Sequence, residues 1–468
     1  MGASFAGTKP GILNPLAISV LFSGIIESHR NPRTDTASLM SDPAHPLEVY
    51  LVGGAVRDEI MGRRIQDRDW LVVGSTPQEM IGLGFRPLGS NFPVFLHPIT
   101  REEYALARTE RKISRGYHGF EFNSDPGITL EQDLSRRDLT MNAMAKDREG
   151  NVIDPWGGCK DIRKGVIRHV SDAFREDPVR VLRVARFAAR YRDDGFEVDP
   201  GTLELMSKMV EEGEVDALVA ERVWQELERS LAEPGCSHFL GILRRCGALE
   251  KILPEVDALF GIPQTEKFHP EIDTGIHVQM SLDAATRISD DSMVRFAVMV
   301  HDLGKALTPA QELPRHRGHE RRGIRPIRQL CDRIGVPARY REFALKVCQY
   351  HLHCHRMVQL KPATVLKVLE AFDGFRKPEL IEKFSLACLA DKRGRTGHEN
   401  DSDEPMQLLN RYHRAAMAVD AGKIAAACHA SVGSRSHCGP GIRKKIRRER
   451  IAAIRAIRDH RTKTGQPG

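Results

Sequence analysis

Two aspartates, Asp67 and Asp69, stand one residue apart and lead into the apolar run 71–73. Because side chains alternate between the two faces of a strand, positions two apart share a face. Carboxylates held this close repel each other unless a cation lies between them, and Mg²⁺ binds one or two carboxylates together with substrate phosphates. The pair therefore predicts a magnesium site for phosphoryl or nucleotidyl transfer, whereas an isolated pair of this kind is more often a solvated turn.

The elements around this pair indicate where a phosphate would bind. The apolar run 49–52 predicts a strand, which breaks into Gly53-Gly54 and then into a helix start at 55–58. Glycines between a strand and a helix N-terminus let backbone N–H groups approach a phosphate, and Arg57 adds positive charge. A glycine pair alone is usually a turn, but the order of strand, glycines, helix and acidic strand is more informative.

The rest of this region predicts a small sheet. The runs 92–96 and 103–107 read as further strands, and Glu110 is either a third metal-binding carboxylate or an exposed residue at a strand end. The segment 113–129 is rich in Ser, Gly, Asn and Asp, which predicts a mobile loop.

Two arginine-containing segments follow. In Arg-Arg-Asp-Leu-Thr-Met-Asn-Ala at 136–143, Arg137 enters an apolar run and needs a partner, which a ribose, a triphosphate or Asp138 would supply. The segment 176–187 predicts a helix with acids in its first turn. At about 100° per residue, its arginines share roughly a third of the circumference, a pattern that is also typical of a solvated surface; they are Arg180, Arg183, Arg186 and Arg190.

These motifs resemble one family. Gly-Gly-Ala-Val-Arg-Asp at 53–58, followed by Asp-Arg-Asp-Trp at 67–70, resembles the head of class II tRNA nucleotidyltransferases, the CCA-adding enzymes of the polymerase β superfamily, of the gammaproteobacterial type. The segment 136–143 is similar to the family's RRDxTxNA motif, and Glu176, Asp177 and Arg180 match EDxxR. The similarity runs from about Glu48 to the tail.

The resemblance implies addition of C, C and A to the tRNA 3′ end from CTP and ATP, by in-line attack of the 3′ hydroxyl on the α-phosphate. Asp67 and Asp69 would be catalytic and would hold Mg²⁺. The nucleotide would contact Gly54, Arg57, Arg137, Asp177, Arg180, Arg183 and Arg186.

The EDxxR motif has a chemical purpose in such an enzyme. Cytosine and adenine both carry an exocyclic amine beside a ring acceptor, so one carboxylate and one guanidinium can read either base. Uracil and guanine present a carbonyl in place of the amine. Asp177 and Arg180 would therefore select C and A without a nucleic-acid template.

A second chemical site is predicted further along the chain. The string His-Asp-Leu-Gly-Lys at 301–305 follows an apolar helix and, with His277 upstream and Asp391 downstream, resembles the HD phosphohydrolase superfamily. A mixed set of imidazoles and carboxylates suits Ni²⁺ or another transition metal better than Mg²⁺, and such a metal can activate water against a phosphate ester. We therefore expect His277, His301, Asp302 and Asp391 to hold a metal. In similar CCA-adding enzymes this module removes 2′,3′-cyclic, 2′ and 3′ phosphates from tRNA ends.

Five further histidines are left open, because they could add substrate contacts, add a second metal or lie on the surface. They are His316, His319, His351, His353 and His355.

Length and composition set the organisation. A chain of 468 residues predicts two to four domains, and we expect an α+β fold: a polymerase β-like head at 48–170, a helical neck and body at 171–270, an HD domain at 274–395 and a basic helical tail at 396–468. Residues 1–47 are expected to be a disordered arm or an upstream-extended reading frame. The apolar stretch 12–26 is too short and too interrupted to span a membrane.

Cysteine usage and charge favour a cytoplasmic protein that binds a polyanion. Nine cysteines without a Cys-x-x-Cys pair favour reduced thiols. Residues 435–463 hold eleven Lys/Arg and two Asp/Glu, a local excess of nine positive charges. The net charge of the whole chain is +7, so the rest of the chain is slightly acidic. This segment is either a tRNA contact or a solvated helix. No protein partner is indicated, so the chain would act as a monomer or homodimer.

Two rival functions remain open at this point. A bacterial poly(A) polymerase would share the head, but such enzymes resemble one another in an Arg-Phe pair where this chain has Gly89-Ser90-Asn91-Phe92. The other rival is an HD phosphohydrolase with an inactive head.

Overall fold

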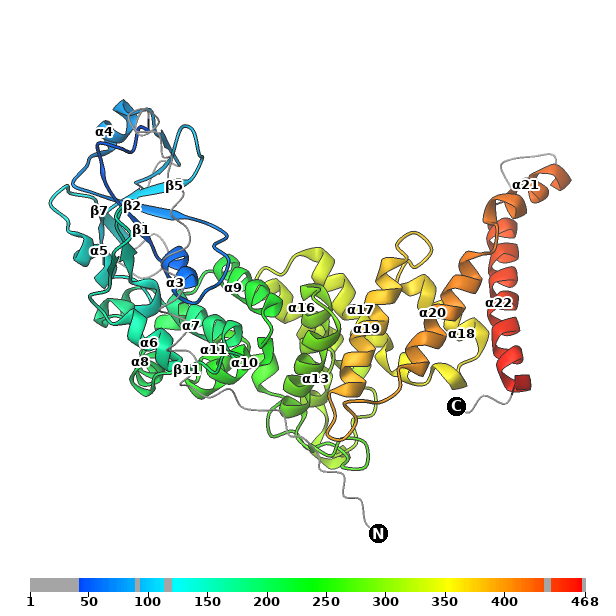
Figure 1. The fold of residues 1–468 in the computed structure, drawn as a ribbon. Coiled ribbons are helices and arrows are strands. Elements are labelled where there is room, and N and C mark those ends of the chain that lie inside the picture. Colours follow the sequence, from blue (N-terminus) through cyan, green and yellow to red (C-terminus); the bar gives the residue numbers. More distant parts are fainter. Residues whose placement is uncertain (1–41, 89–92, 113–119, 433–438, 465–468) are drawn as a thin grey trace, which may run out of the picture.

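The computed structural model describes residues 42–88, 93–112, 120–432 and 439–464. It is an α+β fold, as predicted, with a mixed sheet at one end and helices over the remaining length. The shape is elongated: the sheet lies at one end and the C-terminal helices at the other (Figure 1).

The sheet has seven strands in the order β3-β4-β5-β2-β1-β8-β9. The antiparallel pair β1 and β2 forms its centre, and β5 lies parallel to β2. The strands are β1 (Glu48–Val52), β2 (Asp69–Val73), β3 (Arg86–Pro87), β4 (Val94–Leu96), β5 (Glu103–Leu106), β8 (Ala145–Lys146) and β9 (Val152–Ile153).

Both faces of the sheet are apolar because the strand residues alternate. Val72 packs with Met80 of α4 (Pro77–Gly82) on one face. Its neighbour Leu71 packs with Leu134 of α5 (Leu130–Ser135) on the other. The sheet is therefore fixed from both sides, and α3 (Gly54–Ile60) follows β1 directly, as predicted.

Two predictions for this region are corrected. Asp67 lies before β2, so only Asp69 belongs to the strand on which both acids were expected. The segment 113–129 is not a loop throughout, because Phe120–Asn123 forms β7 and pairs with β6 (Thr109–Lys112). Alternating aromatic side chains in β7 favour a strand, although polar residues surround it. The side chain of Glu110 and residues 113–119 lie outside the described part.

A series of short elements connects the sheet to the helical part of the molecule. These are η2 (Thr140–Asn142), α6 (Gly158–Lys164), β10 (Val166–Ile167), η3 (Asp172–Glu176), α7 (Val179–Arg190) and β11 (Glu197–Val198). β10 and β11 form a separate parallel pair. The helix predicted over 176–187 therefore begins three residues later than expected, and the acids at 176 and 177 precede it.

The remainder is helical, as predicted for 203–259 and for the tail. The helices are α8 (Pro200–Glu211), η4 (Glu214–Ala217), α9 (Ala220–Ala232), α10 (Cys236–Arg245), α11 (Ala248–Ile252), α12 (Pro254–Asp257), α13 (Thr274–Ile288), α14 (Ser292–Val300), η5 (Leu303–Leu307), η6 (Ala310–Glu312), α15 (His319–Arg322), α16 (Ile324–Arg333), α17 (Ala338–His355), η7 (Met357–Gln359), α18 (Pro362–Ala371), α19 (Glu379–Arg393), α20 (Glu404–Met417), α21 (Ala421–Val432) and α22 (Gly439–Thr464). One cluster of buried apolar side chains runs from Leu139 to Ile454 through these helices.

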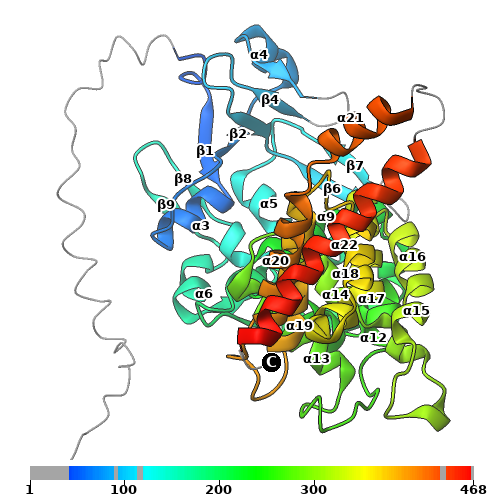
Figure 2. The ribbon, with the colours of Figure 1, turned by 90° about the vertical axis from the view of Figure 1, so that its right-hand side faces the viewer.

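The last helix closes the far end of the molecule. α22 lies across α18 and α20 (Figure 2), and Ile454 on its inner face is fully buried. Among the described residues, no helix combines the length and apolar character needed to cross a bilayer. The eight described cysteines are all free thiols.

Candidate functional sites

A polar pocket of about 500 Å³ lies where the sheet meets α7 and α9. Seven arginines and three aspartates line it, so its wall is strongly positive and suits a triphosphate. The lining residues are Gly53, Gly54, Arg57, Asp69, Arg108, Arg136, Arg137, Asp138, Asn142, Asp177, Arg180, Arg183, Phe187 and Arg222. Seven of the nine residues predicted for the nucleotide site are among them, whereas Asp67 and Arg186 are not.

The glycine turn forms one edge of this pocket. Gly53 has a φ of +69°, which favours glycine, and a Cβ atom there would lie 2.9 Å from Nη1 of Arg137. No side chain caps the N-terminus of α3, which begins at Gly54. The turn therefore places the backbone of Gly53 next to the guanidinium of Arg137.

Asp69 faces this pocket from the first position of β2. Both Asp67 and Asp69 are exposed side chains. Desolvation raises the pKa of Asp69, Arg137 opposes that shift, and the nearby charge of Asp67 adds to it. Asp67 is thus near enough for its charge to act on Asp69, and a cation between the two carboxylates would relieve that repulsion.

Arg57 is buried and held by protein groups rather than pointing freely at a ligand. Its Nη1 donates to Oδ1 of Asn142 at 2.6 Å, and its Nε donates to Oδ1 of Asp58 at 2.9 Å. The guanidinium also lies 5.3 Å from the centre of the Phe187 ring. These contacts fix its position at the pocket wall.

The structure shows which protein groups pair with Arg137 and Asp138. Arg137 donates to Oδ2 of Asp133 at 3.2 Å. Asp138 instead accepts from Nε of Arg183 at 2.7 Å. Burial alone would raise the pKa of Asp138, but Arg183 and Asn142 lower it to about 2.

The predicted arginine row on α7 is not a solvated surface. Arg180 donates to the backbone carbonyls of Ala173 and Arg136, each at 2.6 Å. Arg186 is buried, and its Nε donates to Oε2 of Glu226 at 2.6 Å. The opposite face, with Val181, Val184, Ala185 and Ala188, packs into the core as predicted.

Arg222 of α9 was missed by sequence reasoning. Its two terminal nitrogens donate to Oδ1 and Oδ2 of Asp177 at 3.1 and 2.9 Å. The sequence offered no signal for this contact, because the two residues are 45 positions apart and nothing in α9 marks one arginine as special. Arg108, Arg136 and Asn142 were also not assigned, although two of them stand inside the quoted 136–143 motif.

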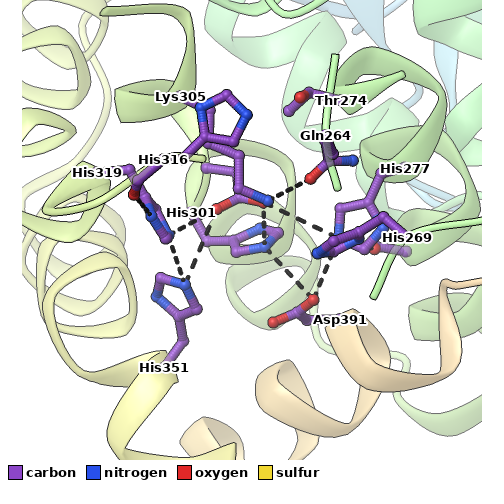
Figure 3. Close-up of polar contacts among 12 residues, drawn as sticks. Gln264, His269, Thr274, His277, His301, Lys305, His316, His319, His351 and Asp391 are labelled. Carbon is purple, nitrogen blue, oxygen red and sulfur yellow. Dashed lines mark hydrogen bonds and ion pairs between the residues drawn. The ribbon is translucent and has the colours of Figure 1, made fainter. Parts of the chain in front are cut away.

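The four residues predicted for the second site converge between α13, α14 and α19. Figure 3 shows three of them together: His277, His301 and Asp391. Nε2 of His277 lies 3.1 Å from Oδ1 of Asp391 and 3.9 Å from Oδ2 of Asp302. Nε2 of His301 lies 3.2 Å from Oδ2 of Asp302 and 3.8 Å from Oδ1 of Asp391. All four side chains are buried.

Two of the five open histidines join this cluster. His319 and His351 are buried, and their Nε2 atoms lie 3.2 and 3.8 Å from Oδ1 of Asp302. His355 instead lies 2.6 Å from Oδ2 of Asp391, and His316 contacts Thr308. His351, His353 and His355 lie on α17 rather than in loops.

The donor set fits a metal ion. Nε2 of His301 and Oδ1 of Asp302 are buried, strong ligand atoms that have ion-pair contacts but no hydrogen bond of good geometry to any described residue. Burial alone would lower the pKa of His301, but Asp302 and Asp391 raise it to about 8, so the site favours a cation.

Close backbone packing and a neighbouring carboxylate support the cluster. Nδ1 of His277 lies 3.1 Å from the carbonyl oxygen of Gly394, its hydrogen-bond partner, and 2.9 Å from Oε1 of Glu271, so the other ring nitrogen faces the aspartates. A Cβ atom on Gly304 would lie 2.0 Å from the carbonyl oxygen of His319, so this glycine lets η5 approach α15.

Comparisons with known proteins agree with this architecture. A family model for the poly A polymerase head domain matches residues 49–168, and one described as the probable RNA and SrmB-binding site of polymerase A matches residues 195–260. A solved CCA-adding enzyme structure, apo form II, has a TM-score of 0.62 over 90% of this chain and 95% of that chain, at 18% identity. Another, with ATP, has a TM-score of 0.59 over 93% and 96%, at 19% identity. These structures share the fold of this chain.

Two relatives extend the similarity over most of the sequence. The multifunctional CCA protein of Nitrosospira multiformis is 52% identical over 409 residues, which cover 87% of this chain and 98% of the relative. The multifunctional CCA protein of Teredinibacter turnerae is 56% identical over 354 residues, covering 76% and 86%. The chain therefore belongs to the family of multifunctional CCA proteins.

Proposed function

We propose that this protein adds C, C and A to the 3′ end of tRNA from CTP and ATP without a nucleic-acid template. The observation that carries this proposal is that Asp69, a cluster of arginines and the pair Asp177 and Arg180 line the same pocket. Its relatives are named for CCA, and the matched solved structures include CCA-adding enzymes with CTP and with ATP.

Different residues of the pocket would bind the triphosphate and the base of the nucleotide. Gly54, Arg57 and Arg137 would hold the triphosphate, because a backbone turn and two guanidiniums meet there. Asp177 and Arg180 would read the base, and Arg183 would contact the base or triphosphate. Arg186 would act through the neighbouring Phe187, because it is paired with Glu226 and its guanidinium lies 4.6 Å from that ring centre.

Enzymes of this family are metal dependent, and the residues present fit Mg²⁺. Asp67 and Asp69 would hold the ion, because a cation between them would relieve the repulsion that contributes to the raised pKa of Asp69. When bound, Mg²⁺ would lower the pKa of the attacking 3′ hydroxyl and neutralise charge on the leaving pyrophosphate. The chain's own groups would orient the nucleotide for in-line attack.

The direct test uses tRNA that lacks its 3′ end and labelled CTP. We expect the wild-type protein to incorporate label and Asp67→Ala to incorporate none. Normal incorporation by Asp67→Ala would refute the metal assignment. Glu59→Ala, which removes an acid from the outside of α3, is the matched control and should retain activity.

We propose a second activity, hydrolysis of phosphate esters at tRNA 3′ ends, at the buried histidine and aspartate cluster. The buried imidazole and carboxylate atoms of His301 and Asp302, which lack a well-formed hydrogen bond to the described residues, support it. His277, His301, Asp302 and Asp391 would hold Ni²⁺ or another transition metal, which would supply an activated water when bound. Ni²⁺-stimulated hydrolysis of a 2′,3′-cyclic nucleotide should disappear in His301→Ala, and its survival there would refute this assignment.

The poly(A) polymerase alternative remains testable by substrate choice. Its distinguishing segment, 89–92, lies outside the described residues. A CCA-adding enzyme incorporates CTP, whereas a poly(A) polymerase incorporates ATP alone.

We also propose the domain division predicted from the sequence: a head at 48–170, a neck and body at 171–270, an HD domain at 274–395 and a tail at 396–468. We propose a cytoplasmic location for the protein as well.

A further inference from the structure

The loop between α12 and α13 brings three side chains to the buried histidine and aspartate cluster. Two of them, His269 and Glu271, contact His277: the two histidine ring centres lie 4.6 Å apart, and Oε1 of Glu271 lies 2.9 Å from Nδ1 of His277. The third is Gln264, which is 3% exposed. Its backbone N–H donates to the carbonyl of Ile272, so the two ends of the loop are paired. None of these three loop side chains was predicted from the sequence.

The oxygen of the Gln264 amide is used within the protein. Oε1 accepts from Nζ of Lys305 at 2.5 Å (Figure 3), and that ammonium also lies 2.6 Å from Oδ2 of Asp302. An ammonium only donates hydrogen bonds, so the amide oxygen rather than the amide nitrogen must face Lys305. This contact fixes the direction of the amide and turns its nitrogen away from Lys305.

The nitrogen of the same amide is a buried donor without an acceptor. Nε2 of Gln264 makes no hydrogen bond to any described residue, and a buried donor in that state costs free energy that an acceptor would regain. An amide nitrogen has only hydrogens to offer, so it cannot serve as a further metal ligand. The donor therefore suits an acceptor that arrives with a ligand.

The charges beside the two aspartates favour an anionic acceptor. Lys305 lies at Asp302, and Nη2 of Arg395 donates to Oδ1 of Asp391 at 3.2 Å. Nε of Arg395 is also buried and makes no hydrogen bond to the described residues. A phosphate oxygen is negatively charged and accepts hydrogen bonds from amides, ammonium groups and guanidiniums, and such charge-assisted bonds are the stronger ones.

We propose that Gln264 is a substrate-binding residue of this second site: Nε2 of its amide donates to a non-bridging oxygen of the phosphate group that is hydrolysed there. This inference rests on the proposed phosphohydrolase activity. Lys305 orients the amide by binding its oxygen, and the loop presents the nitrogen to the phosphate. The contact is made with the bound substrate, so its loss should weaken binding more than it slows the reaction.

The experiment measures KM and kcat of the full-length protein with Ni²⁺ for hydrolysis of 2′,3′-cyclic AMP, and its affinity for inorganic phosphate by calorimetry. Gln264→Met keeps the length of the side chain and removes the donor. We expect it to raise KM and to weaken phosphate binding about tenfold, the loss of one hydrogen bond to a charged group. Its kcat and its affinity for Ni²⁺ should stay close to those of the wild type.

Gln264→Glu separates substrate binding from support of Lys305. A glutamate keeps an acceptor for the ammonium, loses the donor and adds a negative charge, so phosphate binding should weaken more than in Gln264→Met. Gln329→Met, which removes an exposed amide from α16, is the matched control and should behave as the wild type. The melting temperature of each variant reports whether it is folded.

The outcomes separate this inference from the proposed activity. If the wild type with Ni²⁺ hydrolyses no cyclic nucleotide, the proposed activity is wrong, and the phosphate titration alone decides whether Gln264 binds the anion. Wild-type phosphate affinity in Gln264→Glu would overturn the inference, because Gln264 would then serve only Lys305. A lower kcat with unchanged phosphate affinity would place the amide against the attacking water, and a loss of Ni²⁺ affinity would place it in support of the metal ligands. Either result would also overturn the inference.

Discussion

At the scale of single residues, the most informative group is Asp138. Its carboxylate is buried and paired with Arg183, and its pKa is lowered to about 2 from 3.8. A carboxyl whose folded pKa is depressed stabilises the fold above its unfolded pKa, and that contribution is lost as the pH falls toward the folded pKa. The shift corresponds to about 2 kcal/mol of stability at neutral pH.

This linkage predicts the behaviour of Asp138→Asn. At pH 7 its free energy of unfolding should be lower than that of the wild type, and the gap should narrow between pH 4 and pH 2. Urea unfolding at several pH values measures this gap. Asp193→Asn, in an exposed turn after α7, is the control. A gap for Asp138→Asn that does not change with pH would contradict the ion pair.

The sequence predicted residue types better than it predicted partners. Asp69, Arg137 and Arg180, which line the pocket, were predicted because their motifs are local. Arg222 and Glu226 were not, because their partners lie 45 and 40 positions away in the chain. Asp138 follows Arg137 directly, yet it pairs with Arg183, since side-chain direction rather than adjacency decides which groups meet.

At the scale of elements, one buried ion pair joins α7 and α9 beside their shared apolar core. The side chains of Arg186 and Glu226 are only 9% and 6% exposed. Glu226→Gln leaves a buried arginine without its counter-charge, which should lower the free energy of unfolding by about 3 kcal/mol. Thermal unfolding measures the loss.

Glu221→Gln is the matched control for this element, because it lies on the exposed side of the same helix. Its effect should stay within about 0.5 kcal/mol. Equal melting temperatures for Glu226→Gln and the wild type would show that the pair does not hold α7 against α9.

Element types were predicted where the apolar pattern was strong. β1, β2, β5 and α14 were expected from their apolar runs, and the packed face of α7 was expected from its 3.6-residue period. β7 was missed because its four residues lie among Gly, Ser and Asn, which favour turns, and its pairing with β6 is a tertiary contact. The start of α7 was misplaced because Glu176 and Asp177 have the composition of a first helical turn.

At the scale of the whole molecule, the two sites are built from different elements. The head pocket uses β2, α7 and α9, whereas the histidine cluster uses α13, α14, α17 and α19. We therefore expect His301→Ala to lose phosphohydrolase activity while keeping CTP addition, and Asp69→Asn to show the reverse. Assaying both activities on both variants checks this, and loss of both activities in either variant would contradict it.

The basic surface of α22, at the C-terminal end of the molecule, predicts a contact with tRNA rather than with the nucleotide. Basic side chains line a groove on α22, among them Lys444, Lys445 and Arg448. Neutralising phosphates in this way gives a salt-dependent, sequence-independent contact. Changing all three to Ala should raise KM for tRNA several-fold and leave KM for CTP unchanged. Arg376→Ala with Lys377→Ala, exposed residues off this groove, is the control, and a change in KM for CTP would contradict the assignment.

The central claim is that a protein surface, rather than a template strand, chooses the added nucleotides. The most direct measurement is to incubate the wild-type protein with tRNA lacking its last three nucleotides and all four nucleoside triphosphates, and then to sequence the new 3′ ends. We predict ends that read C, C, A and stop. Runs of A, or ends with mixed bases, would contradict the claim.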